Sequence, residues 1–125
     1  MAVLPKIVSK AWEDREGPVI LTTLNGDGIP NAIYVTCVSK FDEETIVVAN
    51  NYFSKTLDNI LAGSKGSILF ITKGGKSYQI KGSFEYYKDG IIFEDMKKWN
   101  PEKHPGHAAA ALKVEEVYAG AEKLL

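Results

Sequence analysis

A short polar motif in the middle of the chain has the residue types that bind phosphate. Ser54, Lys55 and Thr56 place two hydroxyls around an ammonium group, at the start of a helix predicted over residues 54–62. The first turn of a helix presents unpaired N–H groups that attract an anion. The motif predicts a cradle for a mononucleotide phosphate, with Lys55 and Thr56 exposed in the ligand-free protein. Spacing alone equally fits an ordinary capped helix with a solvated lysine, because Ser and Thr are common helix caps.

The elements that would position this motif are mostly β-strands. Apolar residues at helical spacing predict an N-terminal helix over residues 5–16, and a second short helix is predicted over residues 91–99. Strands are predicted over residues 19–24, 29–39, 45–50, 67–72, 77–87 and 109–118. Short strands with tight turns predict one mainly β domain over residues 1–125, a small closed or partly open barrel rather than a βαβ sheet.

The first three predicted strands form a meander in this interpretation. The Asn-Gly and Asp-Gly pairs of residues 25–28 predict a hairpin turn, and residues 41–44 predict a second turn. The strand that starts near residue 29 is then expected to lie beside residues 45–50. Two strand edges and the phosphate motif would converge on one flat ligand.

The order of the motifs along the chain resembles that of the pyridoxamine-phosphate-oxidase-like split-barrel family, especially its short FMN-binding members. The resemblance covers residues 16–118 and rests on Asp-Gly-x-Pro at 27–30, Ser-Lys-Thr-x-x-Asn at 54–59 and Lys-Gly-Ser at 81–83. It implies a six-stranded, Greek-key-like split barrel with short helices. It also implies that FMN binds at the interface of a homodimer.

The resemblance further implies which residues hold FMN. The phosphate would be held by Ser54, Lys55 and Thr56, and Asn59 would either support their loop or cap its own segment. The isoalloxazine would be flanked by strand residues Asn31, Ile33, Tyr34 and Val35 and by the strand-end residues Ala49, Asn50 and Asn51. The second protomer would contribute Tyr78, Gln79 and Trp99.

The flavin would carry the redox chemistry, so no catalytic side chain is required of the protein. We expect an FMN-dependent oxidoreductase or an electron-transfer protein, whose donor and acceptor the sequence does not identify. Arg15 is the only arginine, and Ile33 stands where the family often has a basic residue. These departures argue against oxidation of pyridoxamine phosphate itself.

Two other functions stay open at this stage. The chain could be a barrel that binds a ligand or nucleic acid without redox activity, because aromatic residues can stack on bases. It could also be a split barrel for another planar cofactor, such as haem or a deazaflavin. A net charge of −1, without strands that alternate basic and aromatic residues, disfavours nucleic acid.

The remaining features indicate an ordinary cytoplasmic protein. His104 and His107 lack a third ligand at a recognisable spacing, so a loop role or the lining of a flavin pocket is favoured over a metal site. The single cysteine, Cys37, is expected to pack in a strand rather than act as a nucleophile. The sequence has no signal-peptide pattern and no apolar run of about 20 residues, so no membrane association is expected.

Overall fold

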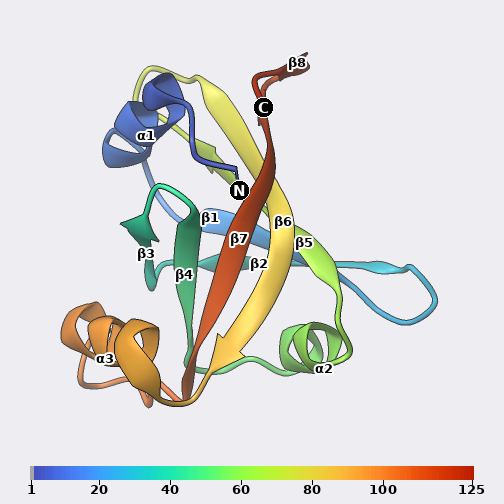
Figure 1. The fold of residues 1–125 in the computed structure, drawn as a ribbon, viewed down its shortest axis with the longest axis vertical. Helices are drawn as coiled ribbons and strands as arrows, with labels where there is room; N and C mark the ends of the chain where they lie inside the picture. The colour runs from blue at the N-terminus through green and yellow to red at the C-terminus, as the bar shows by residue number, and fades with distance from the viewer. Residues whose placement is uncertain (1) are drawn as a thin grey trace.

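Nearly half of the chain lies in one curled antiparallel sheet, shown in Figure 1. The structure is a computed structural model that describes residues 2–125. The helices are α1 (Lys6–Glu13), α2 (Lys55–Leu61) and α3 (Gly90–Trp99). The strands are β1 (Val19–Leu24), β2 (Pro30–Val35), β3 (Val38–Asp42), β4 (Thr45–Asn50), β5 (Lys65–Ile71), β6 (Ser77–Tyr87), β7 (Ala108–Ala119) and β8 (Glu122–Lys123).

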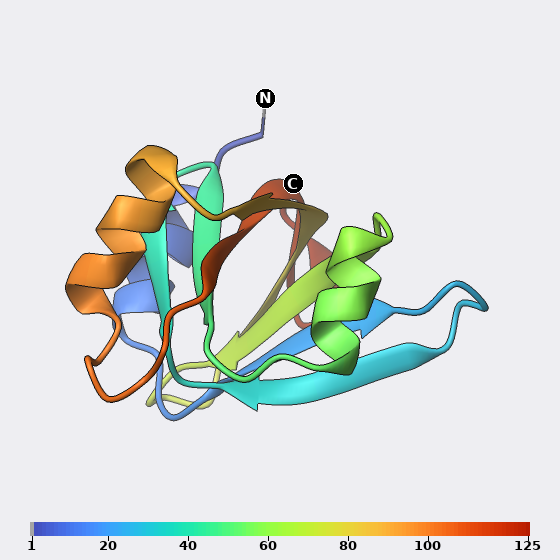
Figure 2. The same ribbon diagram turned by 90° about the horizontal axis from the view of Figure 1, so that it is seen from below.

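The sheet curls so that its two end strands are neighbours in the sequence. The strand order is β2-β1-β5-β6-β7-β4-β3, and β8 adds to β7. The end strands β2 and β3 are joined only by Thr36 and Cys37, so the split in the barrel lies next to this link (Figure 2). This confirms the predicted mainly β split barrel with short helices.

Both turns of the expected meander are present, since β1 pairs with β2 and β3 pairs with β4, but its second strand is not one continuous element. Residues 29–39 form two strands instead of one, because the chain turns at Thr36, whose carbonyl accepts a hydrogen bond from the N–H of Val38 at 3.1 Å. As a result β2 pairs only with β1, whereas β4 lies between β3 and β7. β2 and β4 therefore face each other across the split rather than sharing hydrogen bonds.

The first helix is shorter than its apolar pattern predicts. α1 ends at Glu13, and Arg15 already forms an isolated bridge with Thr72. The helix covers the barrel interior with Trp12, whose indole meets Phe70 edge-on at 5.1 Å between ring centroids. This contact anchors the end of the barrel that lies away from α2 (Figure 1).

A second apolar cluster fixes the strands beside the split. Every residue of β4 is buried, because one face points into the barrel and the other lies under α3. Met96 of α3 packs there with Val47 and Ala49 of β4, and the small side chains of Ala109 and Ala111 of β7 leave room for the helix. α3 thus holds the end of β4 in place. Within residues 2–125, no helix combines the length and apolarity needed to cross a membrane.

The Lys-Gly-Ser segment of β6 has a clear structural role. The pairing of β6 with β7 shifts register between Lys81 and Gly82, which marks a bulge. A Cβ atom on Gly82 would lie only 1.8 Å from the carbonyl oxygen of Lys113. Glycine is required because the two backbones approach each other too closely for any side chain.

Candidate functional site

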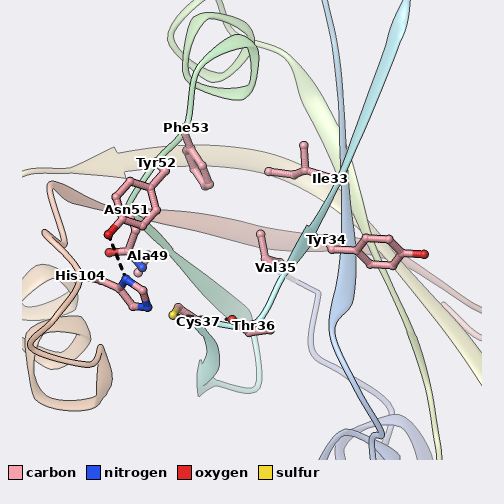
Figure 3. Close-up of a pocket in the computed structure, with 10 residues that line it drawn as sticks. All are labelled: Ile33, Tyr34, Val35, Thr36, Cys37, Ala49, Asn51, Tyr52, Phe53 and His104. Carbon is pink, nitrogen blue, oxygen red and sulfur yellow. Dashed lines mark hydrogen bonds between the residues drawn. The ribbon is translucent and has the colours of Figure 1, made fainter.

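A pocket of about 310 Å³ opens in the split between β2 and the end of β4 (Figure 3). It is lined by Ile33, Tyr34, Val35, Thr36, Cys37, Ala49, Asn51, Tyr52, Phe53 and His104. Its volume is at the small end of the range for ligand pockets, which is about 300–1,000 Å³. We call it the split pocket. Its walls are mainly apolar, and polar groups gather where Tyr52 meets His104.

The register of β2 decides which of its side chains face the split pocket. Ile33 and Val35 pair with the buried residues Leu21 and Val19 of β1, so they lie on the inner face of the sheet. Figure 3 shows both side chains on the side of Phe53, whereas Tyr34 points away. Tyr34 is accordingly 76% exposed. It adds backbone to the pocket and an aromatic ring to the outer face of the sheet.

The chain leaves β4 through a turn fixed by Asn50. Its side-chain amide donates to the Tyr86 hydroxyl at 2.6 Å, and its side-chain oxygen accepts the Phe53 N–H at 3.0 Å. The first bond ties the turn to β6, and the second folds the chain back toward the barrel. Phe53 is thereby placed against the split pocket.

A buried pair of asparagines joins this turn to the loop that follows α3. The Asn51 and Asn100 side chains exchange two hydrogen bonds of 3.0 Å, and Asn51 Oδ1 also accepts the Gly106 N–H at 2.9 Å. Both side chains are almost fully buried, with 8% of Asn51 and 7% of Asn100 exposed. We call this arrangement the amide clamp. Lys97 reinforces it by donating to the carbonyls of Pro105 and Gly106 at 3.1 and 3.3 Å.

The amide clamp brings His104 to the split pocket. Its Nδ1 lies 3.1 Å from the Tyr52 hydroxyl, and the two rings meet edge-on with centroids 5.5 Å apart. Figure 3 shows the imidazole beside Tyr52 at the end of the pocket away from Ile33. A phenol and an imidazole in contact can donate and accept hydrogen bonds.

A second, larger hollow lies between α2 and the β1–β2 hairpin. It has a volume of about 590 Å³ and is lined by Asn25, Gly26, Ile29, Pro30, Asn31, Lys55, Asp58, Asn59 and Ala62. We call it the hairpin hollow. Lys55 is exposed at its edge, and no carboxylate among residues 2–125 lies within ion-pair distance of its ammonium group.

α2 is attached to the sheet by a predicted phosphate ligand, Thr56, and by a residue predicted to support the phosphate loop, Asn59. Thr56 was expected to be exposed, but it is only 2% exposed because α2 turns it toward β2. Its hydroxyl oxygen accepts a hydrogen bond from the Asn31 side chain at 3.0 Å. Asn59 donates to the Thr23 hydroxyl, also at 3.0 Å. These bonds fix the position of α2 and leave Ser54 and Lys55 on the surface.

The structure thus brings most of the predicted ligands to two neighbouring hollows. Those that line the split pocket are Ile33, Tyr34, Val35, Ala49 and Asn51. Those that line the hairpin hollow are Asn31, Lys55 and Asn59. The prediction that residues of β2 and of the end of β4 surround one space holds, although these strands do not pair.

The three residues predicted to reach the site from a second protomer line neither hollow of their own chain. Tyr78 stacks on Phe70 inside the barrel and is only 4% exposed, which leaves almost no surface for a partner to contact. Gln79 lies on β6 opposite Leu69. Trp99 ends α3 and donates to Asp95 at 3.3 Å. Strand periodicity gives the alternation of β6, but only the curl of the sheet shows which face becomes the core.

Several pocket residues escaped the analysis of the sequence. Tyr52, Phe53 and Thr36 follow predicted ligands directly, so their position in the chain was a usable signal. Cys37 was expected to be buried packing, but it is half-buried and lines the split pocket. For His104 the lining of a flavin pocket was one of the roles considered, but it is 52 positions away from Tyr52 and no local pattern shows where its loop docks.

The titratable groups with shifted pKa values lie outside both hollows. A hydrogen bond from Lys40 lowers the pKa of Glu43, and a hydrogen bond from Lys65 lowers the pKa of Glu115. Burial lowers the pKa of Arg15. The two carboxylates belong to surface ion pairs, which contribute little to stability. Within residues 2–125, no group of three potential metal ligands is found.

Comparison with known proteins identifies the family. A sequence profile described as pyridoxamine 5'-phosphate oxidase matches residues 8–120, so the chain belongs to the pyridoxamine 5'-phosphate oxidase family. The uncharacterized protein MJ0282 of Methanocaldococcus jannaschii is 33% identical over 106 residues, which cover 80% of this chain and 70% of that protein.

Solved structures agree with the fold. HupZ of Group A Streptococcus superimposes with a TM-score of 0.79 at 21% identity, over 93% of each chain. An FMN-binding protein from Syntrophomonas wolfei superimposes with a TM-score of 0.73 at 18% identity, over 83% of this chain and 77% of that one. At these identities the similarity establishes the split-barrel fold and leaves the ligand to be argued from the site.

Proposed function

We propose that this protein binds FMN and acts as an FMN-dependent oxidoreductase or electron-transfer protein. The observation that carries the proposal is the succession of two hollows along the same elements. The split pocket is lined by Ile33, Val35 and Phe53, and the hairpin hollow by Asn31 and Lys55. Both hollows are built from β2 and from the chain that leads from β4 into α2. A ligand with a flat apolar end and an anionic end matches this order.

The residues present fit the two ends of FMN. Ile33, Val35 and Phe53 offer apolar contacts to a ring system, and exposed backbone and polar side chains lie at its edge. Lys55 offers to a phosphate a positive charge that forms no ion pair within residues 2–125, and the neighbouring Ser54 adds an exposed hydroxyl. When bound, the flavin would supply the redox chemistry, and the chain would orient the ring and limit its contact with water.

Thr56 and Asn59 act on the phosphate end indirectly in this proposal. Both are hydrogen-bonded to the β1–β2 hairpin, so they hold α2 and the residues before it in position. The proposal therefore assigns direct phosphate contact to Ser54 and Lys55. It assigns to Thr56 the attachment of α2 to Asn31.

We propose further that a second copy of the chain covers the outer face of β2, β1 and β5. Figure 2 shows no helix on the side of β1 and β2 that faces away from α2. Tyr34, Ile20 and Leu69 form one row across these strands, and Tyr34 and Leu69 are exposed. An isologous dimer would bury such a row against its own copy. It would also place protein beside the split pocket.

The first test is the binding of FMN to the purified protein by absorption and fluorescence titration, with the bound species then released and identified. Lys55→Ala should weaken binding about tenfold or more, because hydrogen bonds to a charged group are worth about 1.5–3 kcal/mol. Lys73→Ala is the matched control, since Lys73 is an exposed lysine in the β5–β6 turn. Failure of the wild-type protein to bind FMN, or capture of haem or a deazaflavin instead, would refute the proposal.

A further inference from the structure

We propose that His104 is a direct ligand contact of the split pocket, donating or accepting a hydrogen bond through Nε2 to a heteroatom at the edge of the bound planar ring. This inference rests on the proposed function, because it assumes that a flavin occupies the pocket. It assigns a ligand-binding role to a loop residue that lies outside the β2 and α2 elements of the site. The contacts of the other polar groups in the pocket support it.

The side chain of Asn51, which also lines the split pocket, makes its hydrogen bonds within the protein. Asn51 Oδ1 accepts from both Asn100 and Gly106, and Asn51 Nδ2 donates to Asn100. Thr36 Oγ1 has Cys37 Sγ as a side-chain neighbour, at 3.9 Å. His104 differs because Nδ1 is engaged by Tyr52 whereas Nε2 has no hydrogen-bond partner among residues 2–125.

The loop holds His104 in a defined position. The amide clamp fixes the loop at Asn100 and Gly106, on either side of His104, and Lys97 binds two carbonyls just after it. The N–H of His104 donates to the Pro101 carbonyl at 3.0 Å, which closes a tight turn. A ring fixed in this way loses little freedom when it meets a ligand.

The hydrogen bond between Tyr52 and Nδ1 couples the protonation of Nδ1 to that of Nε2. When the phenol donates to Nδ1, Nε2 carries the proton and is a donor. When Nδ1–H donates to the phenol oxygen, Nε2 is an acceptor. The pair can therefore meet either kind of heteroatom at a ring edge. Tyr52 is a positioning residue in this scheme, and His104 is the contact.

Four variants test the contact through the affinity for FMN. His104→Ala and His104→Asn should each weaken binding about three- to tenfold, which is the loss of one hydrogen bond. His104→Gln should retain most of the affinity, because its longer amide reaches the position of Nε2, whereas the Asn amide reaches only that of Nδ1. His107→Ala is the control, since His107 is exposed in the same loop and does not line the pocket.

A second readout separates direct contact from a change in loop structure. With ¹⁵N-labelled histidine, the Nε2 resonance of His104 should shift when FMN is added, and that of His107 should not. Wild-type binding with no effect of His104→Ala, equal losses for His104→Ala and His107→Ala, or an unmoved Nε2 resonance would overturn the inference alone. Failure of the wild-type protein to bind FMN would overturn the proposed function as well.

Discussion

The contribution of the amide clamp to stability can be tested by replacing one side-chain group. Asn100→Asp replaces the Nδ2 group, which donates to Asn51 Oδ1 at 3.0 Å, by an oxygen. One hydrogen bond is lost, and two oxygens face each other in a site that is 7–8% exposed. Loss of a buried partner costs about 1–3 kcal/mol, and burial of a charge adds to it. We expect a loss of about 2–3 kcal/mol near pH 8.

The same substitution has a definite pH dependence. Burial and the facing oxygen of Asn51 raise the pKa of the introduced carboxyl in the folded state above its unfolded value of about 3.9. The protonated form can donate to Asn51 Oδ1, so the destabilisation is small below the unfolded pKa. It grows as the pH rises to the folded-state pKa and is complete above it.

Thermal unfolding of the wild-type and variant proteins at pH 4 and pH 8 measures this effect. At pH 8 the midpoint of Asn100→Asp should lie about 10 °C below that of the wild type, since 1 kcal/mol corresponds to roughly 3–5 °C at this chain length. At pH 4 the difference should shrink to a few degrees. Asn100→Ala should be destabilised to the same extent at both pH values. A difference for Asn100→Asp that does not change with pH would refute the role of the clamp.

Three other predictions test the fold, the surface electrostatics and the assembly. Gly82→Ala should destabilise the protein by about 3 kcal/mol or more in urea unfolding, because its Cβ would lie 1.8 Å from the Lys113 carbonyl oxygen; a wild-type midpoint would refute the close approach. Glu43→Gln should cost less than about 1 kcal/mol at pH 7. Because Lys40 lowers the pKa of Glu43, the stability that this carboxylate contributes should be present above its unfolded pKa of about 4.3 and be lost as the pH falls through the folded value; a difference from wild type that persists at pH 2 would contradict this. Tyr34→Glu should convert a dimer into a monomer in sedimentation velocity, and an unchanged sedimentation coefficient would refute the proposed dimer surface.

Local sequence signals were sufficient for most of the elements. Alternation of apolar and polar residues, together with β-branched residues, correctly predicted five of the six strand segments. A strand that borders the core has one apolar face, and this alternation shows it. The segment over residues 29–39 was misjudged because nothing in Thr36 or Cys37 marks a break. These two residues turn the chain only because β2 and β3 end at opposite edges of the same sheet.

The sequence alone did not predict which strands are neighbours in the sheet. β4 pairs with β3, which contains the end of the predicted second strand, but its other neighbour is β7, which follows it by almost 60 residues in the chain. The pairing of strands so far apart in the chain depends on long-range contacts, and these leave no local pattern in the sequence. The same limit explains why Tyr78 was assigned to a surface although it stacks inside the barrel.

The sequence by itself determined the family, the β-rich composition of the domain and the segment over residues 49–59 from which both hollows take part of their lining. It could do so because these properties depend on residue types at short, fixed spacings. Only the tertiary structure decided that Thr56 is buried against Asn31, that Lys55 remains free at the surface, and that the loop carrying His104 docks beside Tyr52. Those outcomes depend on the curl of the sheet and on buried hydrogen bonds between distant residues, which form only when the whole chain is folded.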